Sequence, residues 1–205
     1  MKIGVLISGR GSNLKALIEA CAKDDFPAKI VVVISNKADA GGLQIAQDAG
    51  IACQFINHRD YETREAFDRV MDQALRDAGV EFVCSAGFMR ILSDEFVEKW
   101  RDRQLNIHPS LLPAFRGLNV YARAIEAGCK VSGCTVHFVR AAMDEGPIVA
   151  QAAVPILEGD TAETLAARIL IEEHKLYPHA LRLVAEGRVT IVDERCVIEG
   201  KPATA

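Results

Sequence analysis

The sequence predicts an α/β fold: a Rossmann-like, doubly wound and mainly parallel sheet with an antiparallel C-terminal portion. Apolar runs of strand length alternate with helical patterns through the first half. These runs are apolar almost throughout, which is typical of parallel strands covered on both faces. In the second half only a short segment separates two long strand-like runs, which favours an antiparallel pair. We expect one domain over residues 1–205, with halves at about 1–100 and 101–205.

The first half reads as alternating strands and helices. Helical periodicity lies at about 13–23, 42–49 and 61–78, and Gly79 can end the last helix. The order of elements predicts right-handed crossovers between parallel strands. The expected strands are Lys2–Ser8, Lys29–Ser35, Ala52–Phe55 and Val80–Ala86.

The second half has a different pattern of predicted helices and strands. A loop framed by Pro109 and Pro113 follows its first strand, and each proline fixes its own φ near −65°. Pro178 should kink the last long helix. The expected helices lie at about 93–99, 119–127 and 161–185, and the expected strands are Gln104–Ile107, Cys129–Arg140, Pro147–Val154, Arg188–Val192 and Cys196–Ile198, before a frayed end at Lys201–Ala205.

Composition excludes several classes of protein. The net charge of −4 argues against nucleic-acid binding, which needs a cationic surplus. No apolar run approaches the roughly 20 residues that cross a bilayer, and the N-terminus lacks the pattern of a signal peptide, so we expect a cytoplasmic protein. The cysteines form no C-x-x-C pair; we expect buried, reduced thiols and no metal at Cys21, Cys53, Cys84, Cys129, Cys134 and Cys196.

Ser8–Asn13 joins the first strand to the first helix. Gly9 and Gly11 let a backbone approach a phosphate closely, and a helix N-terminus favours anions. Ser12 and Asn13 can either cap the helix or donate to phosphate oxygens. The string is neither a G-x-G-x-x-G fingerprint nor a Walker A loop, so a monophosphate fits better than NAD or ATP. The alternative is a turn without a ligand.

The strand that ends in Asn106-Ile107-His108 is the strongest candidate for chemistry. The i, i+2 spacing points the amide and the imidazole to one face of an extended segment. An amide can stabilise a developing oxyanion, and an imidazole can move a proton. Asp144, in the tight turn before Gly146 and Pro147, can orient that imidazole, although a solvated turn carboxylate is equally open locally. These groups suit transfer of a small acyl group to an amine.

Other polar residues have weaker signals. His137 lies inside a strand, which favours a buried, hydrogen-bonded residue over a catalytic one. Glu172 and Glu173 fall near the apolar stripe of the last long helix, where a carboxylate needs a partner. A ligand amine or hydroxyl and an arginine are equally good partners.

Together these strings resemble the phosphoribosylglycinamide formyltransferases, the folate-dependent enzymes of purine synthesis. The resemblance is colinear over nearly the whole chain, and the motif around Asn106 and His108 is specific to formyl-folate transferases. The strings that carry it are Ile7–Leu14, Ala86–Leu92, Asn106–Pro113, Val136–Val139, Asp144–Ile148, Glu173-His174 and Tyr177-Pro178.

The resemblance implies an activity and a set of roles. The enzyme would move a formyl group from 10-formyltetrahydrofolate, its co-substrate, to glycinamide ribonucleotide, as a monomer or homodimer and without a metal. Asn106, His108 and Asp144 would be catalytic. The first half would hold the ribotide phosphate and the second half the catalytic groups and folate. The implied ribotide contacts are Gly11, Ser12, Asn13 and Glu173; the implied folate contacts are Arg64, Met89, Arg90, Ile91, Leu92, Asn106, Val139, Arg140 and Asp144.

The sequence also departs from the family pattern. Relatives often read Leu-His-Thr-His after Gly117, where this chain has Asn119 and Tyr121 as the second and fourth residues. The implied roles of Asn106, His108 and Asp144 are untouched by this loss, but substrate affinity could differ. A tRNA formyltransferase would carry a further nucleic-acid-binding domain and a formyltetrahydrofolate deformylase an N-terminal regulatory one, neither of which we expect here. A deformylase-like hydrolase and a non-catalytic folate- or ribotide-binding module remain the alternatives.

Overall fold

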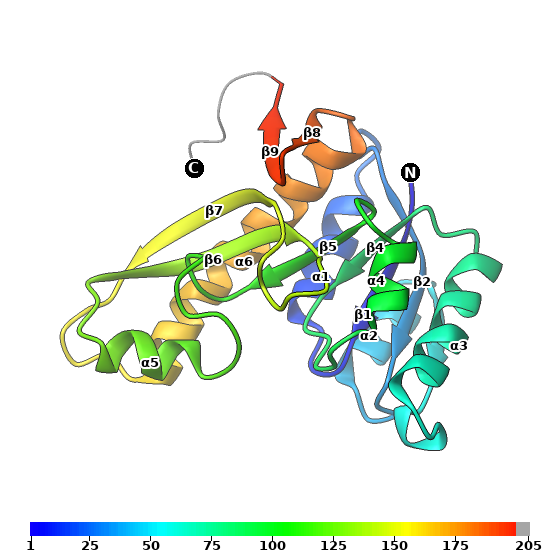
Figure 1. The fold of residues 1–205 in the computed structure, drawn as a ribbon, viewed down its shortest axis with the longest axis horizontal. Coiled ribbons are helices and arrows are strands. Elements are labelled where there is room, and N and C mark those ends of the chain that lie inside the picture. The colour runs from blue at the N-terminus through cyan, green and yellow to red at the C-terminus, as the bar shows by residue number, and fades with distance from the viewer. Residues whose placement is uncertain (200–205) are drawn as a thin grey trace. The chain divides into compact units, whose positions relative to one another are not determined.

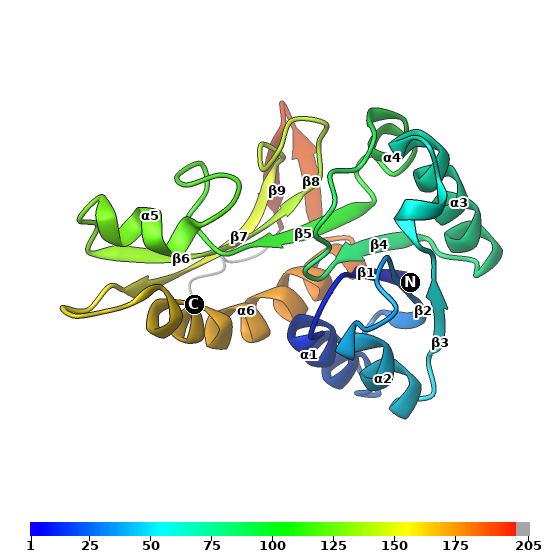
Figure 2. The ribbon, with the colours of Figure 1, turned by 90° about the horizontal axis from the view of Figure 1, so that it is seen from below.

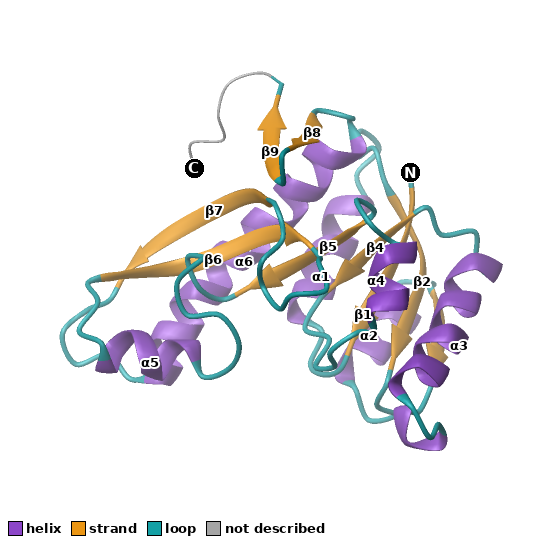
Figure 3. Ribbon diagram, viewed as in Figure 1, coloured by secondary structure: helices purple, strands orange, loops and turns teal. Residues whose placement is uncertain are grey.

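The computed structural model describes residues 1–199, so Lys201–Ala205, expected to be frayed, lie outside the described residues. The chain divides into two compact units, Met1–Asn106 and Ile107–Ala205. A single domain over the whole chain stays a prediction. Helices and strands alternate along the first unit (Figure 3).

The first unit is a parallel sheet with helices on both faces. The strand order is β3-β2-β1-β4-β5, and every neighbouring pair is parallel. Helices α1 and α2 lie on one face and α3 and α4 on the other (Figures 1 and 2). The strands are β1 Lys2–Ile7, β2 Lys29–Ser35, β3 Ala52–Phe55, β4 Phe82–Ser85 and β5 Gln104–His108; the helices are α1 Ser12–Cys21, α2 Gly41–Asp48, α3 Arg64–Asp77 and α4 Asp94–Lys99, with a 3₁₀ turn, η1, at His58–Asp60.

The core of this unit explains why β1, β2 and β4 are apolar almost throughout. Leu6, Ile34 and Val83 project from β1, β2 and β4 against Phe67 of α3 and Trp100 after α4. Since helices cover both faces, few strand positions can be polar.

The second unit is built on an antiparallel pair. β6 (Val131–Phe138) pairs with β7 (Ile148–Pro155), and α6 (Ala162–Ala185) packs against both strands. α5 (Val120–Glu126) contacts α6, and β8 (Val189–Val192) and β9 (Arg195–Ile198) form a hairpin. The mainly parallel sheet with an antiparallel C-terminal portion is therefore confirmed.

Two sequence-based expectations need correction. Ser12 and Asn13 do not cap α1, because Gly11 occupies the N-cap position with φ 79° and no side chain caps the helix. Within residues 1–199 no disulfide joins the six cysteines, but only Cys84 and Cys134 are buried and the other four are half-buried. α6 is continuous through Pro178, and the kink expected at this residue stays a prediction. Over residues 1–199, no helix is both long and apolar enough to span a membrane.

Candidate active site

Asn106 and His108 lie near the end of β5, on the same face by strand periodicity. Asn106 is half-buried, and the His108 residue is 6% exposed. Asn106 stands opposite Ser85 in the parallel register with β4. The strand therefore fixes the direction of both side chains at the edge where ligands of such sheets collect.

Asp144 lies beside His108. Its Oδ2 is 3.4 Å from His108 Nδ1 and accepts a hydrogen bond of 2.9 Å from the Gly117 N–H. The side chains of His108 and Asp144 are 8% and 10% exposed, so water screens this ion pair little. Asp144 has φ 57°, a left-handed conformation that aspartate adopts more readily than most residues. The solvated-turn alternative for Asp144 is therefore wrong.

His137 flanks the same carboxylate from the other side, with its Nε2 3.8 Å from Asp144 Oδ1. It is 2% exposed, and its Nδ1 lies 2.9 Å from the Phe138 carbonyl, which can only accept. The expected buried, hydrogen-bonded histidine is confirmed. Burial lowers the pKa of His137, which disfavours the charged form of this ring.

The loop after Pro113 touches both acidic and basic partners. His108 Nε2 lies 3.0 Å from the Phe115 carbonyl, so each ring nitrogen of His108 faces an oxygen acceptor. A ring that carries two protons would satisfy both acceptors. Arg116 forms an ion pair with Glu145, the residue after Asp144. Both side chains of this pair are exposed, so it holds the loop to the turn only weakly.

Two residues that the sequence reading missed hold the proline-framed loop. Thr135 Oγ1 donates to the Ser110 carbonyl (2.7 Å) and accepts from the Leu112 N–H (3.0 Å). Gln151 Nε2 donates to the Leu112 carbonyl and to Thr135 Oγ1, both at 2.9 Å. Polar residues within the otherwise apolar strands β6 and β7 were the available signal, because buried polar groups need partners.

The Ser8–Asn13 loop, which we expect to hold a phosphate, depends on close backbone approach. A Cβ on Gly11 would lie 2.5 Å from the Gly42 Cα, and the Gly42 N–H donates to the Gly9 carbonyl at 3.1 Å. Only glycine fits at position 11, where φ is 79°. Ser12 and Asn13 form the first turn of α1, whose N-terminal N–H groups have no side-chain cap and suit an anion.

The residues expected to hold folate lie on the segment after β4, on the segment after β6 and at the start of α3. Met89, Arg90 and Ile91 are exposed and Leu92 is half-buried, all between β4 and α4. Val139 and Arg140 follow β6.

Arg140 Nε donates to Glu194 Oε2 of the β8–β9 hairpin at 2.6 Å. Arg64, also expected near folate, is the exposed first residue of α3. Asn119, where relatives often have histidine, is the N-cap of α5 with φ 56°, a conformation that asparagine tolerates.

Glu173, expected to contact the ribotide, is 6% exposed on α6, whereas Glu172 pairs with Lys175 at 2.8 Å. Burial raises the pKa of Cys134 to about 12, and the nearby charge of Glu173 contributes in the same direction. Glu173 is therefore a buried carboxylate rather than part of a solvated face.

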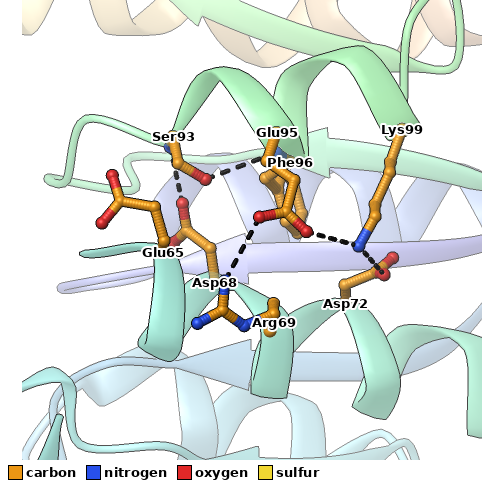
Figure 4. Close-up of a pocket in the computed structure, with 8 residues that line it drawn as sticks. All are labelled: Glu65, Asp68, Arg69, Asp72, Ser93, Glu95, Phe96 and Lys99. Atoms are coloured by element: carbon orange, nitrogen blue, oxygen red, sulfur yellow. Dashed lines mark hydrogen bonds and ion pairs between the residues drawn. The ribbon is translucent and has the colours of Figure 1, made fainter. Parts of the chain in front are cut away.

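A pocket between α3 and α4 contains none of the expected site residues (Figure 4). Its walls are paired with each other: Asp72 Oδ2 is 3.4 Å from Lys99 Nζ, and Lys99 also pairs with Glu95 at 3.0 Å. Asp72 Oδ1 further accepts from Trp100 Nε1 at 3.0 Å. These contacts join the two helices, and we assign the pocket no ligand.

Comparison with known proteins agrees with the fold and the motifs. The formyl transferase family model matches residues 1–181, so the chain belongs to the formyl transferase family. A phosphoribosylglycinamide formyltransferase of Haemophilus influenzae is 44% identical over 98% of this chain and 94% of its own length. The glycinamide ribonucleotide transformylase 1 structure from Symbiobacterium toebii superposes with a TM-score of 0.95 and 51% identity, covering 97% of this chain and 93% of that one. Within the formyl transferases, this chain is therefore a member of the phosphoribosylglycinamide formyltransferase family.

Longer relatives contain the same region. The trifunctional purine biosynthetic protein adenosine-3 of Bos taurus is 52% identical over 93% of this chain, which spans only 19% of that protein. The match concerns one part of a larger protein.

Proposed function

We propose that this enzyme transfers the formyl group of 10-formyltetrahydrofolate to the amine of glycinamide ribonucleotide, in purine synthesis. The products are formylglycinamide ribonucleotide and tetrahydrofolate. Membership of the family supports the reaction. The observation that carries the chemistry is the buried His108–Asp144 pair, at 3.4 Å, beside the strand that also carries Asn106.

In this reaction Asn106 and the protonated His108 stabilise the oxyanion that forms when the amine attacks the formyl carbon. A proton then passes from the attacking nitrogen to the folate nitrogen, N10, as the C–N10 bond breaks. His108 moves it directly, or Asp144 holds a water that does so. Asp144 also orients the His108 ring during this step, because its Oδ2 lies 3.4 Å from His108 Nδ1.

The binding roles follow from charge and backbone geometry. Gly11, Ser12 and Asn13 would receive the ribotide phosphate at the uncapped N-terminus of α1, and Glu173 would accept from the glycinamide ribotide. The folate contacts that we propose are those of the two loop segments and their neighbours: Arg64, Met89, Arg90, Ile91, Leu92, Asn106, Val139, Arg140 and Asp144. No step in this scheme uses a metal. Six cysteines outside disulfides, within residues 1–199, fit a reducing compartment, so we place the enzyme in the cytoplasm.

The test is tetrahydrofolate release by the purified protein, with and without glycinamide ribonucleotide, beside the His108→Ala variant. We expect release that requires the ribotide and falls at least about 10²-fold in the variant, as for loss of an oxyanion donor. Release without the ribotide would instead indicate a deformylase-like hydrolase. Tight ligand binding without turnover would indicate a binding module.

A further inference from the structure

The segment Gly87–Ser93, between β4 and α4, has no regular secondary structure and yet presents apolar side chains outward. Met89 is 69% and Ile91 60% exposed, whereas Phe88 and Leu92 pack against the core. An apolar surface on a loop needs a reason, and binding of an aromatic ligand such as a pterin supplies one. The position of this short segment must then be held by its ends.

Ser8, the residue after β1, holds the first end. The Met89 N–H donates to Ser8 Oγ at 2.8 Å, and the Ser8 N–H donates to the Gly87 carbonyl at 3.1 Å. Ser8 is 3% exposed, so water cannot readily replace it as the acceptor for Met89. This residue also precedes Gly9, where the proposed phosphate-binding loop begins.

The direction of the Ser8 hydroxyl is fixed by a second buried residue. Ser8 Oγ donates to Asn36 Oδ1 at 2.6 Å, and Asn36 Nδ2 lies 3.3 Å from His58 Nδ1. Asn36 is itself 3% exposed. A hydroxyl has one proton, and because it goes to Asn36, a lone pair is left for the Met89 N–H.

Asp68 of α3 holds the other end. Its Oδ2 accepts from the Ser93 N–H at 2.5 Å, and Ser93 Oγ in turn accepts from the Phe96 N–H, which caps α4 (Figure 4). With Ser93 fixed in this way, loss of the Ser8 contact would release only the residues before it.

We propose that Ser8 is a positioning residue for folate binding, which fixes Met89 and its neighbours through the Ser8–Met89 hydrogen bond. The inference rests on the proposed function, which assigns this segment to folate. Without the hydroxyl, the segment occupies its binding conformation for only part of the time, and the apparent dissociation constant rises by the inverse of that fraction. Loss of one buried hydrogen bond corresponds to about tenfold.

The experiment compares Ser8→Ala with Ser85→Ala. Ser85 ends the neighbouring strand β4, is 5% exposed, and its Oγ accepts from Gln104 Nε2 at 3.1 Å. We expect Ser8→Ala to raise KM for 10-formyltetrahydrofolate about tenfold with kcat within twofold, and Ser85→Ala to leave that KM within twofold. Ser8→Thr, which keeps a hydroxyl, should restore KM. If Ser8→Ala does not fold, Ser8→Cys, which keeps the volume with a weak acceptor, takes its place.

Hydrogen exchange of the Met89 amide gives a second readout that needs no substrate. We expect protection at this amide to fall in Ser8→Ala and to persist in Ser85→Ala. Lost protection with an unchanged KM would overturn the positioning role, and so would an equal rise of KM in both variants. If the wild type does not formylate the ribotide, the proposed function fails. The positioning role of Ser8 is then decided by the dissociation constant of tetrahydrofolate alone. A dissociation constant that is equal in the wild type and Ser8→Ala, or no binding to the wild type, overturns the positioning role.

Discussion

Asp144→Asn isolates the charge of the buried ion pair from its shape. The amide has nearly the same volume as the carboxylate, and its oxygen can still accept from the Gly117 N–H, now 2.9 Å from Oδ2. Asparagine also tolerates the φ of 57° at this position, whereas alanine would be strained there. We therefore expect Asp144→Asn to fold like the wild type and to lose only the charge beside His108.

The size of the effect follows from the distance between the charges. At 3.4 Å and an effective dielectric constant of roughly 20, the attraction between Asp144 and a charged His108 is about 5 kcal/mol. Part of it offsets the cost of burying two charges, which leaves about 3–4 kcal/mol for the step in which His108 is charged. Turnover should fall about 10²–10³-fold, at about 1.4 kcal/mol for each factor of ten.

The assay is steady-state release of tetrahydrofolate with both substrates varied, together with thermal unfolding. Glu145→Gln is the matched control, because it removes a charge one residue away, from an exposed ion pair with Arg116. Its kcat should stay within about threefold, as expected for a surface pair. A kcat of Asp144→Asn within twofold of the wild type, with an unchanged melting temperature, would refute the role of the ion pair.

Three further predictions concern stability and reactivity. Gly11→Ala should lower the free energy of unfolding in urea by at least about 2 kcal/mol, because φ at this position is left-handed and the new Cβ would overlap with α2. Gly9→Ala is the control: there is open space around its Cβ, so the free energy of unfolding should change by less than about 0.5 kcal/mol. Equal losses in the two variants would contradict this prediction. The hydrogen bond from Arg168 holds the pKa of Asp160 well below its usual range. The carboxylate therefore stabilises the fold above the unfolded pKa of about 3.9, and this stability is lost as the pH falls further. The melting temperature of Asp160→Asn should lie below that of the wild type at pH 7, and a difference between the two melting temperatures that does not narrow below about pH 4 would be the contrary result. Burial raises the pKa of Cys134 to about 12, so iodoacetamide at pH 8 should label this thiol only after unfolding, and rapid labelling of the native protein, mapped by mass spectrometry, would disagree.

The sequence predicted the parts of the fold that depend on local pattern. The runs at Lys29–Ser35 and Ala52–Phe55 match β2 and β3 residue for residue. β2 is largely buried and apolar, as parallel strands covered on both faces are, whereas β3 lies at the edge of the sheet and is mostly exposed. The side-by-side placement of Asn106 and His108 follows from the two-residue period of a strand. The contact between Asp144 and His108 spans 36 positions of the chain. It was expected because a carboxylate can orient an imidazole and because the family resemblance implied both residues.

Contacts that depend on backbone groups or on side chains far apart in the sequence could not be predicted from local sequence pattern. The Phe115 carbonyl beside His108 Nε2 could not be predicted, because every residue carries a carbonyl. The Ser8–Met89 hydrogen bond joins residues 81 positions apart, and only the fold brings them together. Capping by Ser12 was a reasonable expectation from residue type, but the left-handed Gly11 already occupies that position.

The most direct test of the proposed reaction follows the formyl carbon itself. The purified enzyme is supplied with 10-formyltetrahydrofolate labelled with ¹³C in the formyl group and with glycinamide ribonucleotide, and the label is followed by NMR. We predict that the label appears as a formamide on the ribotide, in a one-to-one ratio with tetrahydrofolate. Label in free formate, or label that stays on folate while the ribotide is intact, would contradict the proposed transfer.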